Sequence, residues 1–66
     1  MADSVQEVLQ AFAKGELVVG AYYQHRKSGW LRCVTDLDGR YVNWTDARGP
    51  GRSLRAVFRS EVSGPV

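Results

Sequence analysis

The sequence predicts a mainly β fold, in which a short N-terminal helix precedes a small barrel of four to five strands. Helical spacing of apolar residues is confined to residues 4–14, and the remainder alternates Val- and aromatic-rich runs with Gly-containing turns. At 66 residues the chain has room for one domain, since a domain of this size buries only about 60% of the surface of its unfolded chain. We therefore expect residues 1–66 to form a single domain without a deeply enclosed active site.

The N-terminal segment is predicted to be an amphipathic helix over residues 4–14. Its apolar residues follow the i, i+3, i+4, i+7, i+8 pattern of one helical face: Val5, Val8, Leu9, Phe12 and Ala13. Ser4 and Glu7 form a capping-box pattern, which places the N-cap at Ser4, and Gly15 is typical of the residue that follows a helix. A helix this short is marginally stable alone, so its apolar face has to pack against the rest of the chain.

Four strands and a short fifth are predicted within a barrel over residues 16–62. They are Leu17–His25, Trp30–Asp36, Tyr41–Thr45 and Ser53–Arg59, with Val62 in the fifth. A Lys-Ser-Gly turn at residues 27–29 and an Asp38-Gly39 hairpin turn separate the first three strands. Residues 46–52 contain Gly-Pro-Gly and are expected to form a loop, and residues 63–66 are expected to be a flexible tail.

The predicted turns determine which residues of neighbouring strands lie side by side. A two-residue turn at Asp38-Gly39 pairs Cys33 with Trp44, and a four-residue turn after His25 pairs Tyr22 with Cys33. Alternation along the strands then places one mainly apolar set toward the core: Val18, Tyr22, Leu31, Cys33, Val42 and Trp44. The other face mixes aromatic, basic and apolar groups: Val19, Tyr23, His25, Trp30, Arg32, Val34, Tyr41 and Asn43. A slip of one residue would exchange the two faces.

The strands and turns of residues 15–62 resemble SH3-like small β-barrels of the Tudor and KOW kind. The resemblance rests on three segments: Leu17–Tyr23 (LVVGAYY), Gly29–Val34 (GWLRCV) and Asp38–Trp44 (DGRYVNW). In such barrels a Gly-Val-aromatic strand is followed by a polar turn, and a tight turn leads into a strand that ends in Trp. KOW-like barrels bind RNA or ribosomal and polymerase partners, so the resemblance implies a binding function.

Tudor-like barrels hold methylated Lys or Arg in an aromatic cage, which is the other function that the resemblance implies. The matching positions for such a cage are Tyr23, Trp30 and Tyr41. A cage also needs an acidic or polar group for the cation, and Asp36, across from Tyr41, is the candidate.

A second and more distant similarity is to the plasmid-borne, trimethoprim-resistant type of dihydrofolate reductase, which is also an SH3-like barrel of this size. It rests on Gly39–Val42 (GRYV), followed by a Pro-Gly loop and a short strand. That enzyme forms a tetramer around a shared pore and uses a Val-Gln-Ile-Tyr run. The matching run here is Leu54–Val57 (LRAV), which lacks the Gln and the Tyr, so the similarity implies a fold parallel and no reductase activity.

No pattern in the sequence indicates catalysis, a cofactor or a metal ion, so we expect the chain not to be an enzyme. The single Cys and the single His, Cys33 and His25, fall on opposite predicted faces, which argues against a Cys–His nucleophile pair. His, Cys, Asp and Glu do not cluster at metal-ligand spacing. One Cys, an acidic N-terminus and the lack of a long apolar run favour a cytoplasmic protein without a signal peptide or membrane span.

Basic residues concentrate where the strands are predicted. Residues 22–59 hold eight of the nine Lys and Arg against three Asp, whereas residues 1–16 carry a net charge of −2. Seven of the nine are Arg, which binds phosphate through two N–H groups and stacks on bases. Tyr and Trp on small β-sheets stack unpaired bases. The predicted function is therefore non-catalytic binding of nucleic acid, RNA or DNA, through these residues: Tyr23, Trp30, Arg32, Tyr41, Arg48, Arg52 and Arg55.

The same mixed face equally suits a protein partner, because protein interfaces are enriched in Tyr, Trp and Arg. The alternative function is therefore a protein-interaction or homo-oligomerisation module, an adaptor or regulator, that uses the same residues. The sequence leaves open whether the N-terminal helix covers this face. Salt dependence separates the two alternatives, since phosphate contacts release counterions from a nucleic acid.

Overall fold

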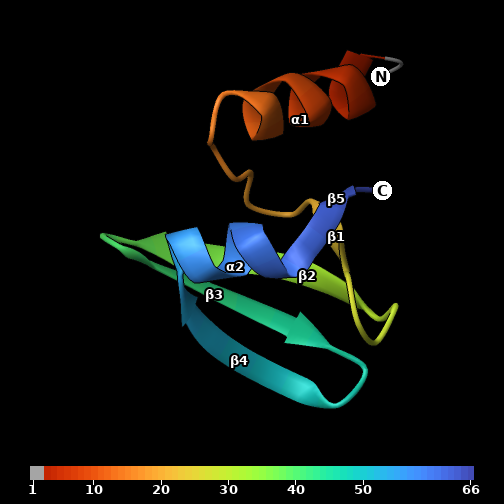
Figure 1. The fold of residues 1–66 in the computed structure, drawn as a ribbon. Coiled ribbons are helices and arrows are strands. Elements are labelled where there is room, and N and C mark those ends of the chain that lie inside the picture. The colour runs from red at the N-terminus through yellow and green to blue at the C-terminus, as the bar shows by residue number, and fades with distance from the viewer. Residues whose placement is uncertain (1–2) are drawn as a thin grey trace.

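A computed structural model, which describes residues 3–66 and the side chains from residue 5 onward, contains one five-stranded antiparallel sheet and two short helices (Figure 1). The elements are α1 (Asp3–Ala13), β1 (Tyr22–His25), β2 (Leu31–Asp38), β3 (Tyr41–Asp46), β4 (Gly49–Leu54), α2 (Arg55–Glu61) and β5 (Val62–Pro65). The predicted mainly β class with an N-terminal helix and five strands is confirmed. The predicted cap at Ser4 lies outside the described side chains.

The sheet runs in the order β4-β3-β2-β1-β5, so consecutive strands pair until the last strand returns to lie beside β1. α2 connects β4 to β5 and packs against β3, β4 and β5, and α1 packs near β5 (Figure 1). Two of the connections, the β1–β2 and β3–β4 turns, lie at one end of the sheet, and the β2–β3 turn lies at the other. β4 and β5 are the edge strands of the described sheet.

The segment after β3 differs from the sequence prediction. The strand predicted over Ser53–Arg59 is wrong, because β4 ends at Leu54 and residues 55–61 form α2. Within α2, Phe58 is the buried residue, while its neighbour Val57 is exposed. A short helix that covers a sheet buries about one side chain per turn, and this pattern replaces strand alternation.

Two smaller boundaries also change. The loop predicted over residues 46–52 is a two-residue turn at Ala47 and Arg48, and Gly49 already begins β4. Residues 63–65, expected in a flexible tail, belong to β5 and pair with β1, whereas the expected fifth strand at Val62 is confirmed.

The core is formed by six buried residues: Leu17, Tyr23, Val34, Val42, Phe58 and Val62. Val42 is a core residue as predicted, and Trp44 packs against this cluster. The prediction for the first two strands is wrong, because Tyr23 and Val34 are buried while Tyr22 and Leu31 are exposed. Inner and outer faces are therefore exchanged in β1 and in the first half of β2.

The predicted pairing also differs at the turn between β2 and β3, by two residues, which leaves the faces unchanged. Asp38 pairs with Tyr41, so the turn residues are Gly39 and Arg40 rather than Asp38 and Gly39. Gly39 has a φ of 59°, the left-handed value that a type II′ turn requires at its first central position. Gly meets this requirement without the steric cost of a Cβ.

A β-bulge within β2 produces the exchange of faces. The register shifts between Val34 and Asp36, and Val34 rather than Cys33 pairs with Trp44. Because neighbouring residues point to opposite faces, this difference of one residue reverses every face assignment upstream of the bulge. The β1–β2 pairing of Tyr22 with Cys33 is as predicted, so β1 and the first half of β2 reverse together.

α1 buries only part of its apolar face. Val8 and Phe12 pack against the core, while Val5 and Leu9 remain exposed. Arg59 of α2 holds the end of α1: its Nη2 donates to the Phe12 carbonyl oxygen at 2.6 Å, and its Cζ lies 4.8 Å from the Phe12 ring centroid. Neither described helix has the length and apolar character needed to cross a membrane.

The contact of Gly51 with Trp44 predicts the cost of a single methyl group. Gly51 pairs with Trp44 across β3 and β4, and a Cβ at Gly51 would overlap the indole ring, whose Nε1 donates to Ser53 Oγ at 3.1 Å. We expect Gly51→Ala to lower the free energy of unfolding by about 1–3 kcal/mol, which is the usual cost of overpacking. Urea denaturation measures the free energy of unfolding. Gln10→Ala, at an exposed position of α1, is the control and should be as stable as the parent. Equal stabilities of Gly51→Ala and the parent would contradict the prediction.

Candidate nucleic-acid interface

Tyr23, one of the seven predicted contact residues, lies in the core instead of on a binding face. Its side chain has no exposed surface, and its ring packs against Phe12 and Phe58, with centroids 5.7 Å away in each case. The phenol oxygen accepts a hydrogen bond from the Val18 backbone N–H at 3.0 Å. Burial raises the pKa of the Tyr23 phenol, because the phenolate would lose its hydration. Tyr23 is therefore unable to stack a base in this fold.

Arg32 is the second predicted contact residue that the fold buries. Its Cζ lies 3.9 Å from the Trp44 ring centroid, and its Nη1 donates to Glu61 Oε1 at 3.2 Å. Only 9% of Arg32 is exposed, so the guanidinium serves as a packed, ion-paired core group and the predicted phosphate contact is wrong. The cause is the face exchange described above, since Tyr23 and Arg32 are paired neighbours on the same side of the sheet.

Trp30 and Arg48 are brought together at the end of the sheet that holds the β1–β2 and β3–β4 turns. Arg48, in the β3–β4 turn, places its Cζ 4.4 Å from the Trp30 ring centroid. Trp30 remains 36% exposed, and Arg26 and Lys27 lie exposed in the turn that precedes it. We call these four residues the basic turn surface: Arg26, Lys27, Trp30 and Arg48.

Local hydrogen bonds fix the shape of the basic turn surface. His25 Nδ1 accepts from the Ser28 backbone N–H at 3.1 Å, and the His25 N–H donates to the Trp30 carbonyl oxygen at 2.8 Å, which closes the turn. The Arg48 N–H donates to Asp46 Oδ1 at 2.8 Å. A hollow of about 310 Å³ borders the turn, lined by His25, Arg26, Lys27, Ser60 and Glu61. Arg26 and Lys27 were not among the contact residues predicted from the sequence, although both lie in the turn that precedes Trp30.

The other predicted residues gather at the opposite end of the sheet. Arg52 places its Cζ 4.3 Å from the Tyr41 ring centroid and donates to Asp38 Oδ2 at 3.2 Å, on the exposed outer face. Arg55 begins α2, and its backbone N–H donates to the Arg40 carbonyl oxygen at 2.8 Å. The predicted single face is thus split into two surface clusters at opposite ends of the sheet, plus two core residues.

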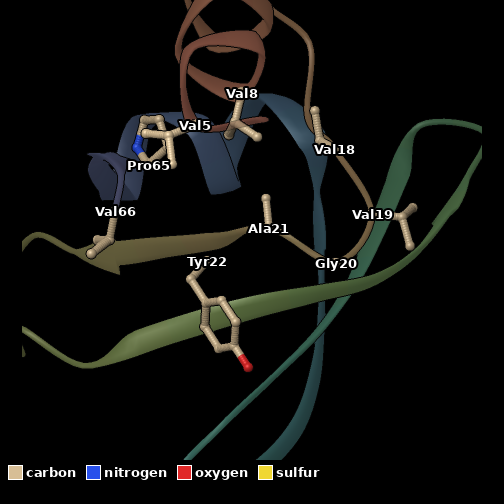
Figure 2. A pocket seen from close by; sticks show the side chains of 9 residues that line it. All are labelled: Val5, Val8, Val18, Val19, Gly20, Ala21, Tyr22, Pro65 and Val66. Carbon is tan, nitrogen blue, oxygen red and sulfur yellow. The ribbon is translucent and has the colours of Figure 1, made fainter. Parts of the chain in front are cut away.

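An apolar groove between α1 and the β1–β5 edge is a feature that sequence reasoning did not identify (Figure 2). It has a volume of about 430 Å³, and Val5, Val19, Tyr22 and Val66 on its walls are each more than half exposed. We call this the α1 groove: Val5, Val8, Val18, Val19, Gly20, Ala21, Tyr22, Pro65 and Val66. The helical spacing assigned Val5 to the packed face of the helix, so the pattern did not mark it as a groove residue.

Comparison with protein-family models, with curated proteins and with solved structures finds no match to this chain. Within the described residues, no three His, Cys, Asp or Glu side chains lie close enough to hold a metal ion. The candidate binding surfaces are the two surface clusters and the α1 groove.

Burial of Tyr23 predicts a loss of stability at alkaline pH. Since the pKa of Tyr23 is raised above its usual 10.0 in the folded state, the unfolded chain loses this proton first. The contribution of Tyr23 is complete below pH 10 and declines as the pH rises from there through the folded-state pKa. Urea denaturation across this range measures the decline.

Tyr23→Phe removes the phenol, so we expect a shallower alkaline decline than in the parent. It also leaves the Val18 N–H without its acceptor, which lowers stability at neutral pH by about 1–3 kcal/mol. Tyr22→Phe, on the exposed outer face, is the matched control. An identical alkaline decline in Tyr23→Phe and the parent would refute the prediction.

Proposed function

We propose that this chain is a small non-catalytic module that binds single-stranded nucleic acid through the basic turn surface. The observation that carries the proposal is the exposed Trp30 ring with Arg48 stacked on it, beside Arg26 and Lys27. Aromatic rings stack on unpaired bases of any sequence, and neighbouring cations follow the phosphate backbone. The proposed relation to SH3-like barrels draws support from the meander of β1 to β4 and from β5 beside β1.

The stack favours nucleic acid because it holds both required groups in place before binding. The Arg48 Cζ lies 4.4 Å from the Trp30 ring centroid, so a base that stacks on the other side of the ring brings its phosphate near this cation. Preorganised side chains lose less conformational entropy on binding than free ones. Trp30 also follows a turn that is closed by the His25–Ser28 hydrogen bond, which limits its movement further.

We expect binding of a short single-stranded oligonucleotide to weaken steeply with salt. Three cations on the basic turn surface correspond to a slope of about −2 in log affinity against log salt concentration, from roughly −0.7 for each phosphate contact on a single strand. Fluorescence anisotropy of a labelled oligonucleotide measures the slope. Arg48→Gln should make the slope less negative by about 0.7, and Trp30→Ala should weaken binding about 10-fold, as loss of one stacked base does.

Lys14→Gln is the matched control for Arg48→Gln. Lys14 is an exposed cation that follows α1, whose C-terminal end lies away from the β1–β2 turn (Figure 1). This variant should keep the affinity and the salt slope of the parent. Equal losses in Lys14→Gln and Arg48→Gln, or a slope near zero in the parent, would show that nucleic acid is not bound at the basic turn surface.

Self-association is a second candidate function, and the α1 groove favours it. Val5 and Leu9, one helical turn apart, form an exposed apolar ridge on α1, and Val5 also lines the groove (Figure 2). A two-fold dimer requires one surface to be complementary to itself, and a ridge beside a groove of the same apolar character meets this requirement. Exposed apolar patches of this kind mark contact surfaces more often than isolated apolar residues do.

Sedimentation velocity across a wide concentration range tests self-association. The parent should approach twice the mass of one chain at high concentration, while Val19→Glu stays monomeric because it places a charge in the groove. Val57→Glu, at a similarly exposed apolar position on α2, is the control and should associate like the parent. A parent that stays monomeric at every concentration would exclude this function.

A further inference from the structure

We infer that the end of the sheet opposite the basic turn surface carries a second anion site, which binds a phosphate group. This site is a hollow of about 460 Å³ between the β2–β3 turn and the start of α2. We call it the Arg40–Arg55 hollow, and its lining residues are Gly39, Arg40, Leu54, Arg55 and Ala56. The inference deepens the proposed function, because the phosphate would belong to the same nucleic-acid strand.

Two arginines from different elements meet at this hollow. Arg40 lies in the β2–β3 turn and Arg55 is the first residue of α2, and the Arg55 N–H bond to the Arg40 carbonyl oxygen holds the two backbones 2.8 Å apart at these atoms. Neither guanidinium forms an ion pair within the described residues. The nearby carboxylate of Asp38 is instead paired with Arg52.

Arg55 is the side chain that most clearly lacks a partner. Arg32, Arg55 and Arg59 each have a buried Nε without a hydrogen-bond acceptor. Arg32 and Arg59 still donate from a terminal nitrogen, to Glu61 and to the Phe12 carbonyl oxygen, whereas no described residue accepts a hydrogen bond from the Arg55 side chain. The buried Nε is out of reach of a ligand, but the two terminal nitrogens of Arg55 are not among the buried atoms and have no acceptor among the described residues. An oxyanion in the hollow would accept hydrogen bonds from these terminal N–H groups.

The directions from which the two arginines approach favour a phosphate over a carboxylate. The two oxygens of a carboxylate direct their lone pairs close to one plane. The free oxygens of a phosphate are arranged tetrahedrally around phosphorus, so they accept N–H groups from two arginines on different elements. Leu54 and Ala56 supply an apolar wall beside it, and Leu54 pairs with Tyr41, which carries the stacked Arg52.

Because the two sites lie at opposite ends of the sheet, we expect affinity to depend on the length of the oligonucleotide. Tyr41 and Asp46, the two ends of β3, are five residue steps apart, which corresponds to about 17 Å at 3.3 Å per residue. A short oligonucleotide should therefore occupy one site, and a longer one should reach both and gain affinity from the higher effective concentration at the second.

Inorganic phosphate is the probe that tests the site independently of any nucleic acid. In amide NMR titrations at constant ionic strength, we expect saturable shifts of the Arg40, Arg55 and Ala56 signals. Arg55→Gln should weaken phosphate binding at least about 10-fold, and Arg55→Lys should weaken it less, because Lys keeps the charge but loses the planar fork. Lys14→Gln, which removes an exposed cation outside both sites, is the control and should bind phosphate like the parent.

Each outcome decides one of the two proposals. Saturable shifts at the Arg40–Arg55 hollow that Arg55→Gln abolishes support the phosphate site, even if oligonucleotides fail to bind and the proposed function falls. Shifts that never saturate, or that appear only at Arg26 and Lys27, overturn the phosphate site. Acetate that binds as tightly as phosphate also overturns it, and indicates an acidic protein partner instead. An unchanged amide spectrum of Arg55→Gln away from the substitution confirms that the variant is folded.

Discussion

The buried Tyr23 side chain is the interaction on which the arrangement of the elements depends. Its ring contacts Phe12 of α1 and Phe58 of α2, and its hydroxyl oxygen accepts the Val18 N–H from the segment between α1 and β1. One side chain of β1 thus contacts both helices and the segment that connects α1 to β1. A domain of this size has few fully buried residues, so a large aromatic ring with a satisfied hydroxyl supplies a substantial share of the core.

Arg32 shows how a small core can accommodate a cation. Its guanidinium lies flat against Trp44 on one side and ends at Glu61 of α2, so the charge is paired and the apolar stem fills space in the core. An arginine on a strand face that also carries aromatic groups looks, from sequence alone, like a binding residue. Such residues are ambiguous in small domains, because stacking and ion pairing stabilise a core as well as a complex.

The sequence was sufficient for the features that depend on local spacing. Predicted residues 4–14 agree with α1 to within a residue, and the four-residue turn after His25 produced the observed β1–β2 pairing. The residues of the inner face could not be predicted from the sequence, because the position of the bulge near Thr35 depends on packing across the sheet. The helix at residues 55–61 was missed for a similar reason, since its single buried ring, Phe58, fits a strand equally well until the sheet beneath it is known.

The same packing explains where the candidate sites lie. Four of the seven aromatic residues, Phe12, Tyr23, Trp44 and Phe58, are used in or against the core, which leaves Tyr22, Trp30 and Tyr41 exposed. The inner face of the sheet is covered by α2, so groups for an external ligand have to come from the outer face or the turns. Two of the three exposed rings carry a stacked arginine, and these stacks lie at opposite ends of the sheet. In the proposed function a single nucleic-acid strand uses both ends, because it is extended and presents phosphates at regular intervals.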